Sequence, residues 1–302
     1  MPVAIVVALV LWGVMTPISI ESGVGLGVML LTLFVLRQFS NLHQLIRVRS
    51  WTVSSVFILL VGFYAVIHKW DIVAACGTLL YLIHIMGLLT SYQSERPQNG
   101  TLIAMIALSA LTMLQPAMLY VLLLSLVAMA SALRTITLKS LVAVLFGVLM
   151  PYEIWVAWHL YCGDLQQAFV EWSTALYTFS VPQIVTEGSW MDILSANLLD
   201  KQRMLVILIG IYGLISIFHF IRTCYNDKIS TRMHYYTLIV EWPALILAVV
   251  FCPDNAPLNV CVLLLSCSPL LAHYFVFSKG WLAFIMFLLF LLSCLFLQLP
   301  IL

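Results

Sequence analysis

Apolar runs long enough to cross a bilayer recur along the whole chain, and only short polar stretches separate them. A transmembrane helix needs about 20 such residues, within a range of roughly 17–25. Runs of this kind cover 3–20, 23–40, 51–68, 72–91, 140–160, 204–222, 235–251, 257–276 and 281–299. The pattern predicts an all-α fold, a polytopic membrane helix bundle that forms a single integral membrane domain over 1–302.

The apolar stretch 101–133 is too long for one ordinary crossing. Its 33 residues would measure about 50 Å as a helix, against a hydrocarbon core of about 30 Å. Gln115-Pro116 lies near its middle, and proline removes a backbone donor and disfavours helix at the residue before it. The stretch is therefore either one long kinked helix or a hairpin of two short helices.

The distribution of basic residues favours the hairpin. In that alternative, ten of the thirteen basic residues fall on one side of the membrane, namely Arg37, Arg47, Arg49, Arg96, Arg134, Lys139, Arg222, Lys228, Arg232 and Lys279. Only Lys69, Lys201 and Arg203 fall on the other side, whereas a single crossing would divide the residues six to seven. Because cytoplasmic loops carry the excess of Lys and Arg, we predict about eleven membrane segments. The N-terminus is then cytoplasmic and the C-terminus lies on the outer side.

Composition excludes most other classes of protein. Hydrophobic residues make up 64% of the chain and charged residues only 8%, against about 25% charged in soluble domains. With 13 Lys+Arg against 12 Asp+Glu, the chain has no basic surface for nucleic acid. We therefore expect membrane lipid as a partner and no nucleic acid.

The one sizeable stretch outside the membrane is 162–203, on the predicted outer face. Apolar residues recur there at helical spacing, as Leu165, Phe169, Trp172, Leu176 and Phe179, and a second run extends from Trp190 to Leu199. Both runs indicate amphipathic helices in the headgroup layer. They either cover the end of the bundle or form a lid for a lipid-borne ligand.

Ionisable residues inside a membrane are costly and are candidates for function. Glu153 and Glu241 each lie two residues from a proline, Pro151 and Pro243, which frees a backbone carbonyl beside the polar side chain. Glu153 falls toward the outer end of its span and Glu241 toward the inner end, so we do not expect them to share a site. Each is either a structural carboxyl or a functional one. His84, near the middle of its span, is expected to be a packing residue that forms hydrogen bonds.

No motif indicates a metal or a cofactor. Phosphate-binding and zinc signatures such as G-x-x-x-x-G-K-[ST] and H-E-x-x-H are absent, and no predicted span holds two histidines for a haem. We expect no metal site and no cofactor.

The order of several short motifs resembles an uncharacterised bacterial family of polytopic inner-membrane proteins, known only as a domain of unknown function. The motifs that carry the resemblance are residues 41–43 (NLH), 47–50 (RVRS), 115–120 (QPAMLY), 134–140 (RTITLKS) and 146–152 (FGVLMPY). The resemblance implies a multi-pass protein of the bacterial inner membrane and no particular activity.

A more distant resemblance is to the C-type polytopic glycosyltransferases, which use polyprenyl-phosphate sugars. Those enzymes also have a proline-broken hairpin, a basic cytoplasmic turn and an apolar helix that ends in a proline. Their acidic catalytic residue follows the first span, and here only Glu21 occupies that place, without a second acidic neighbour. The resemblance makes Glu21 the candidate catalytic residue of such an enzyme.

These observations favour a non-catalytic integral inner-membrane subunit or accessory protein of cell-envelope assembly. The alternatives are the glycosyltransferase and, third, a small-molecule or lipid transporter. The segment 257–299 is nearly free of charge, with only His273 and Lys279 ionisable, so we predict that it docks against other membrane proteins.

Overall fold

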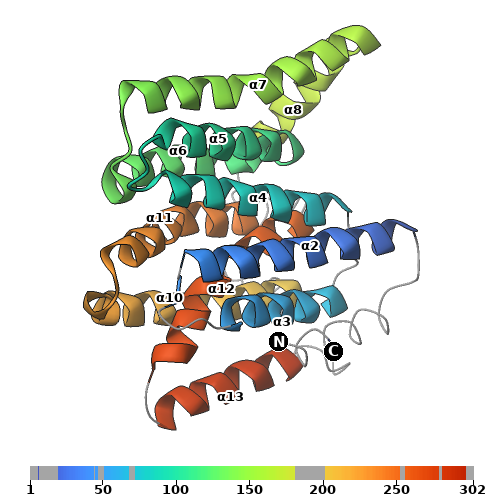
Figure 1. Ribbon diagram of the computed structural model, residues 1–302. Helices are drawn as coiled ribbons and strands as arrows, with labels where there is room; N and C mark the ends of the chain where they lie inside the picture. Colours follow the sequence, from blue (N-terminus) through green and yellow to red (C-terminus); the bar gives the residue numbers. More distant parts are fainter. Residues whose placement is uncertain are drawn as a thin grey trace.

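The computed structural model describes residues 6, 20–43, 45–46, 51–67, 72–180, 201–251, 256–278 and 281–296. Within these ranges the chain is helical and contains no strand (Figure 1). The elements are α2 (Ile20–Leu42), α3 (Thr52–Ile67), α4 (Ile72–Ser91), α5 (Pro97–Leu114), η1 (Pro116–Met118), α6 (Leu119–Ala128), η2 (Met129–Leu133), α7 (Leu138–Cys162), α8 (Leu165–Ser180), α10 (Lys201–Thr223), η4 (Cys224–Asn226), α11 (Ile229–Phe251), α12 (Ala256–Phe277) and α13 (Trp281–Phe296).

The described part confirms the prediction of a multi-pass membrane bundle. Eight of its helices are long and apolar enough to cross a bilayer, and two shorter apolar helices cover Thr52–Tyr64 and Phe284–Ser293. Most of them lie side by side along a common direction (Figure 1). The predicted span 3–20 lies outside the described residues apart from Val6 and Ile20.

The stretch 101–133 is a hairpin. Gln115 has extended backbone angles (φ −145°, ψ 99°) and separates α5 from η1 and α6, as expected for a residue before proline. Successive contacts pair α5 with α7 in the same direction, because the Ser109 hydroxyl donates to the Val148 carbonyl and Thr112 bonds to Tyr152. Since α5 and α7 run in the same direction, α6, which connects them in the chain, must cross in the opposite direction.

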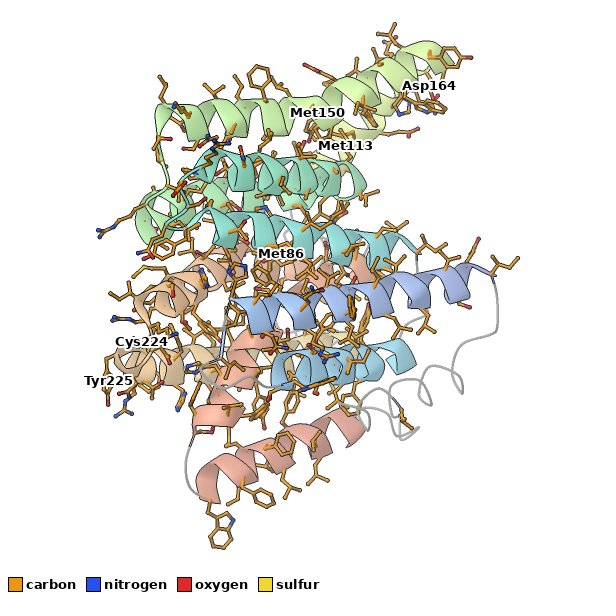
Figure 2. The ribbon with its side chains drawn as sticks, viewed as in Figure 1. Met86, Met113, Met150, Asp164, Cys224 and Tyr225 are labelled. Atoms are coloured by element: carbon orange, nitrogen blue, oxygen red, sulfur yellow. The ribbon has the colours of Figure 1, made fainter. Side chains whose placement is uncertain are left out.

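This hairpin gathers basic residues at one end of the bundle. The seven Lys and Arg whose side chains are described all lie near this end, namely Arg37, Arg96, Arg134, Lys139, Arg222, Lys228 and Arg232. We call it the basic end, and we call the end that holds the Gln115–Pro116 break the hairpin end. Cys224 and Tyr225 mark the first and Asp164 the second (Figure 2).

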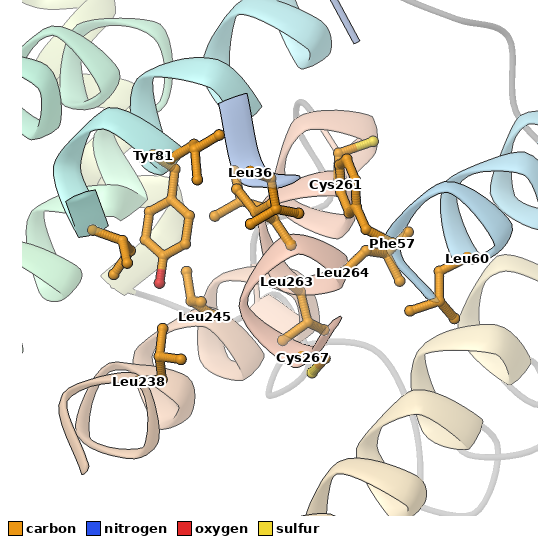
Figure 3. Close-up of a cluster of buried hydrophobic side chains, with 14 of the residues drawn as sticks. Leu36, Phe57, Leu60, Tyr81, Leu238, Leu245, Cys261, Leu263, Leu264 and Cys267 are labelled. Carbon is orange, nitrogen blue, oxygen red and sulfur yellow. The ribbon is translucent and has the colours of Figure 1, made fainter. Parts of the chain in front are cut away.

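The centre of the bundle is α12. Every residue from Leu258 to Tyr274 is buried, as expected for an interior membrane helix that is mainly apolar on all sides. Leu36 of α2, Phe57 and Leu60 of α3 and Leu245 of α11 gather around it (Figure 3). Residues 258–274 of the predicted docking segment therefore face other helices of the same chain.

α13, by contrast, keeps an open apolar face. Its Phe290 is buried and packs on Tyr212 of α10 with 4.9 Å between ring centroids. Phe284, Leu288 and Leu292 are exposed at four-residue spacing, so they share the opposite side of the helix. Within the described part of 257–299, only this helix offers a partner such a face.

α4 and α5 approach one another backbone to backbone. A Cβ atom on Gly87 would lie 2.7 Å from the Gly100 carbonyl oxygen, and one on Gly100 would lie 2.6 Å from the Gly87 oxygen. Only glycine permits this crossing, which is the usual means of close packing between membrane helices.

α7 packs on α5 through a narrow stripe of small residues. Only Ser140, Ala143, Gly147 and Pro151 are buried along it, while Phe146 and Trp158 on its other sides are exposed. α7 therefore forms the edge of the bundle (Figure 1).

The predicted amphipathic helix over 165–179 is present as α8, which turns back beneath the end of α7 toward the hairpin break (Figure 1). Gly163 makes the turn possible because its φ of 78° is one that glycine adopts without strain. Phe169, on the predicted apolar face of this helix, is 58% exposed. The second predicted run, Trp190 to Leu199, lies outside the described residues.

The charge distribution predicts that the basic end faces the cytoplasm. In a cysteine-free background, Ile136→Cys at the basic end should resist an impermeant thiol reagent on intact spheroplasts, and Asp164→Cys should react. Both side chains are exposed, so permeabilised cells should label both. Labelling at 136 in intact cells would contradict this orientation.

Candidate functional site

Four polar side chains from three helices meet inside the bundle: Tyr81 and His84 from α4, Ser125 from α6 and Glu241 from α11. All four are fully buried. Tyr81 extends from α4 toward the helix that carries Leu238 and Leu245 (Figure 3). We call these four residues the carboxyl cluster.

Glu241 is the centre of the carboxyl cluster. The Tyr81 hydroxyl donates to its Oε2 at 3.0 Å, and the Ser125 hydroxyl donates to its Oε1 at 2.8 Å. Nε2 of His84 lies 3.2 Å from Oε1. Both carboxyl oxygens are thus hydrogen-bonded, as buried polar groups must be to remain in an apolar interior.

The hydrogen bonds also determine the tautomer of His84. Its Nδ1 lies 3.0 Å from the Ala104 carbonyl oxygen, which can only accept, so Nδ1 carries a proton. Nε2 lies within hydrogen-bond distance of both Glu241 Oε1 and the Ser125 hydroxyl, the latter 3.1 Å away. A hydrogen bond between Nε2 and the carboxyl needs one further proton, held either by the imidazole or by the carboxyl. The pair is electrically neutral overall in both cases, which is the least costly state in a low-dielectric interior.

The carboxyl cluster lies at the middle depth of the bundle. His84 is seven residues before the end of α4, Ser125 eight before Leu133 and Glu241 twelve after the start of α11. At about 1.5 Å per residue these are roughly 10–18 Å from the basic end. Glu241 is mid-helix rather than toward the inner end as predicted, because α11 begins at Ile229 and not near 235.

The other predicted acidic residues lie elsewhere. Glu153 is exposed on α7, and Glu21 is exposed in the first turn of α2. Neither joins Glu241.

The prolines act as helix breaks in different ways. Pro243 lies within α11 just after Glu241, and Pro151 lies within α7. The Val148 carbonyl, one turn before Pro151, accepts from Ser109 at 2.8 Å. Such side-chain bonds satisfy carbonyls where proline disturbs a membrane helix. Gln115 and Pro116 separate two helices.

Sequence reasoning missed Tyr81 and Ser125. Their only advance signal is weak: Tyr81 precedes His84 by three residues, which places both on one helical face. Nothing in the sequence spacing links Ser125 to His84 or to Glu241, which lie 41 and 116 positions away.

A cavity of about 420 Å³ lies at the hairpin end, between α7, α8 and the Gln115–Pro116 break. Its lining includes Trp155 and His159 of α7 and Glu171 and Trp172 of α8. We call it the outer cavity, after the side of the membrane that the charge distribution predicts for this end. No residue of the carboxyl cluster lines it.

Four side-chain contacts position the elements around this cavity. Thr112 and the Tyr152 hydroxyl are 2.8 Å apart, and the Trp172 ring lies edge-on to Tyr152 with 6.0 Å between centroids. Nδ1 of His159 lies 2.8 Å from Asp164 across the α7–α8 turn. The Gln167 amide donates to Glu171 at 2.9 Å. The walls of the outer cavity are therefore positioned by side-chain contacts on three elements.

Comparisons of the chain with protein-family models, with curated proteins and with solved structures gave no match. Among the described residues, no three His, Cys, Asp or Glu side chains gather closely enough to hold a metal ion.

Replacing Glu241 tests the carboxyl cluster. Glu241→Leu leaves Tyr81, His84 and Ser125 without their acceptor, so we expect the free energy of unfolding to fall by about 3–5 kcal/mol. Glu241→Gln retains an acceptor oxygen and should cost only about 1–2 kcal/mol. Thermal and denaturant unfolding of the purified protein measures both.

Glu153→Leu is the matched control because Glu153 is exposed, and its effect should stay within about 0.5 kcal/mol. Equal losses for the Gln and Leu variants of Glu241 would contradict the predicted role of the hydrogen bonds.

Proposed function

We propose that this chain is a non-catalytic membrane subunit or accessory protein of bacterial cell-envelope assembly, which binds the headgroup of a lipid in the outer cavity. The observation that carries the proposal is the cavity itself. At about 420 Å³ it falls within the roughly 300–1,000 Å³ of small-molecule pockets, and its apolar walls carry a few convergent polar groups, as ligand sites do.

The surroundings of the cavity support a lipid rather than a freely dissolved ligand. Trp155, Trp158 and Tyr161 lie within the last two turns of α7, and Trp172 is on α8. Trp and Tyr concentrate at the boundary between hydrocarbon and headgroups. Phe169 and Val170 of α8 are exposed and do not line the cavity, so acyl chains would cover them.

The charges of the lining support a particular headgroup. Of the described residues that line it, Glu171 and His159 are the ionisable ones, and none is Lys or Arg. A carboxylate accepts hydrogen bonds and attracts cations. A headgroup with hydroxyl or amine donors, as in a sugar or an aminoalcohol, therefore suits it better than a bare phosphate.

The two alternatives have less support from the described residues. A transferase that used a polyprenyl-phosphate sugar would need cationic groups near the phosphate, and Glu21 does not line the cavity. A transporter needs a path to its intramembrane site, whereas the carboxyl cluster is fully buried.

Trp172→Ala tests the proposal. Removing this side chain from the cavity wall should reduce the lipid retained after gentle detergent purification by about tenfold, because a Trp ring offers a large contact area to a ligand. Mass spectrometry of the released lipid measures the loss and identifies the headgroup.

Phe169→Ala is the control on the same helix, since Phe169 is 58% exposed and lines no part of the outer cavity. It should retain the lipid. Equal retention by Trp172→Ala and the unchanged protein would refute lipid binding in the outer cavity.

A second variant tests docking through α13. Leu288→Trp adds bulk to the exposed face and should leave folded yield unchanged, because lipid accommodates an apolar side chain. A membrane protein that docks there should no longer copurify, since helix association depends on close packing. Leu145→Trp on α7, also exposed, is the control. Retention of the same partner by Leu288→Trp would rule out this face.

A further inference from the structure

A second cavity lies at the basic end, opposite the outer cavity. It encloses about 280 Å³ between the ends of α2 and α4 and the start of α11. Polar residues dominate its lining, including His43, Thr90, Lys228, Ser230 and His234. We call it the basic cavity. Its volume is just below the roughly 300–1,000 Å³ of typical ligand pockets, which suits a small polar group.

The basic cavity lies at the N-terminus of a 23-residue helix. The first intrahelical bond of α11 runs from the Arg232 N–H to the Lys228 carbonyl at 3.0 Å. Backbone N–H groups of a first helical turn, such as those of Ile229 and Ser230, have no acceptor within their own helix. Together with the helix dipole they favour an anion.

A buried histidine gives an independent indication of a ligand. His234 lines the cavity and is only 4% exposed. Its ring bonds to the Leu89 backbone, yet its buried Nδ1 has no hydrogen-bond partner among the described residues. A buried nitrogen of this kind usually pairs with a bound water or ligand.

The side chains that line the basic cavity and can carry a charge near neutral pH are all basic. Lys228 supplies a full positive charge, and the rings of His43 and His234 lie 6.1 Å apart. Among the described residues, no Asp or Glu lines the cavity. The nearest acidic residue in sequence, Asp227, points Oδ2 at Nε2 of His273, 3.0 Å away. Burial lowers the pKa of His43, and an anion beside the ring would favour its charged form.

We propose that the basic cavity binds a phosphate group, either as inorganic phosphate or as the phosphomonoester headgroup of a lipid. Its oxygens accept from Lys228, from the Ser230 hydroxyl and from the first-turn N–H groups of α11. A hydrogen phosphate also carries an O–H, which donates to Nδ1 of His234 when that nitrogen is unprotonated. This site is separate from the outer cavity and does not depend on the lipid proposed there.

The test uses the full chain in neutral detergent at constant ionic strength and measures binding by calorimetry and thermal shift. One arm titrates inorganic phosphate, with chloride as the reference. The second titrates dioctanoyl phosphatidate, with dioctanoylglycerol as the phosphate-free reference. Binding in the first arm identifies a free phosphate site, and binding in the second arm alone identifies a headgroup site.

Lys228→Gln should weaken whichever probe binds by about tenfold or more, because it removes one charge-assisted hydrogen bond. Lys139→Gln is the matched control: Lys139 is exposed at the same end and does not line the cavity, so the affinity should change less than twofold. His234→Phe retains an aromatic ring but removes Nδ1, so it should also weaken binding.

If His234→Phe does not fold, Lys228→Gln still decides, because Lys228 is exposed and its replacement leaves the core intact. The absence of binding in both arms would overturn the proposal. Equal weakening by Lys228→Gln and Lys139→Gln would also overturn it, since it would mean general attraction to the basic end.

Discussion

The buried carboxyl of Glu241 is the constraint on which the arrangement of the central helices depends. A carboxyl group in an apolar interior must find hydrogen-bonding partners, and its partners come from α4 and α6 at 2.8–3.2 Å. Apolar contacts alone do not select which helix faces which, because lipid tails are as apolar as leucine. The carboxyl cluster therefore specifies the rotation and depth of α4, α6 and α11.

Close packing elsewhere makes these bonds possible. The contact between Gly87 and Gly100 brings α5 against α4, so that the Ala104 carbonyl reaches Nδ1 of His84 at 3.0 Å. α12 packs against α4 and α11 from the other side and is itself buried throughout its middle. A larger residue at the glycine crossing would separate the helices and break the bond that sets the tautomer of His84.

The two cavities lie at the ends of the bundle and the carboxyl cluster at its middle. This division follows from solvation, because charged and polar ligands reach a membrane protein most easily where its helices meet water and headgroups. The outer cavity is lined by an acid and by aromatic rings, and the basic cavity by Lys228 and two imidazoles. Their opposite chemistry is consistent with different ligands at the two membrane surfaces.

The sequence by itself determined the class of the protein, the positions of most spans and the hairpin at Gln115–Pro116. These features depend on local properties: apolar length, the missing proline donor and the side on which basic residues fall. The sequence also identified His84 and Glu241 as polar residues inside membrane spans. Only the tertiary structure decided that they meet each other, that Ser125 joins them and that Glu153 faces outward.

The same limit applies to the burial of α12 and to both cavities. The sequence of an apolar helix is similar whether the helix faces lipid or other helices, because the two surroundings are equally apolar. The predicted docking segment 257–299 therefore included a helix that lies inside the bundle. Each cavity combines residues from elements far apart in the chain, such as His43 with His234 and Gln115 with Trp172. The spacing of residues along the chain does not predict such pairs, because the folding of the intervening helices brings them together.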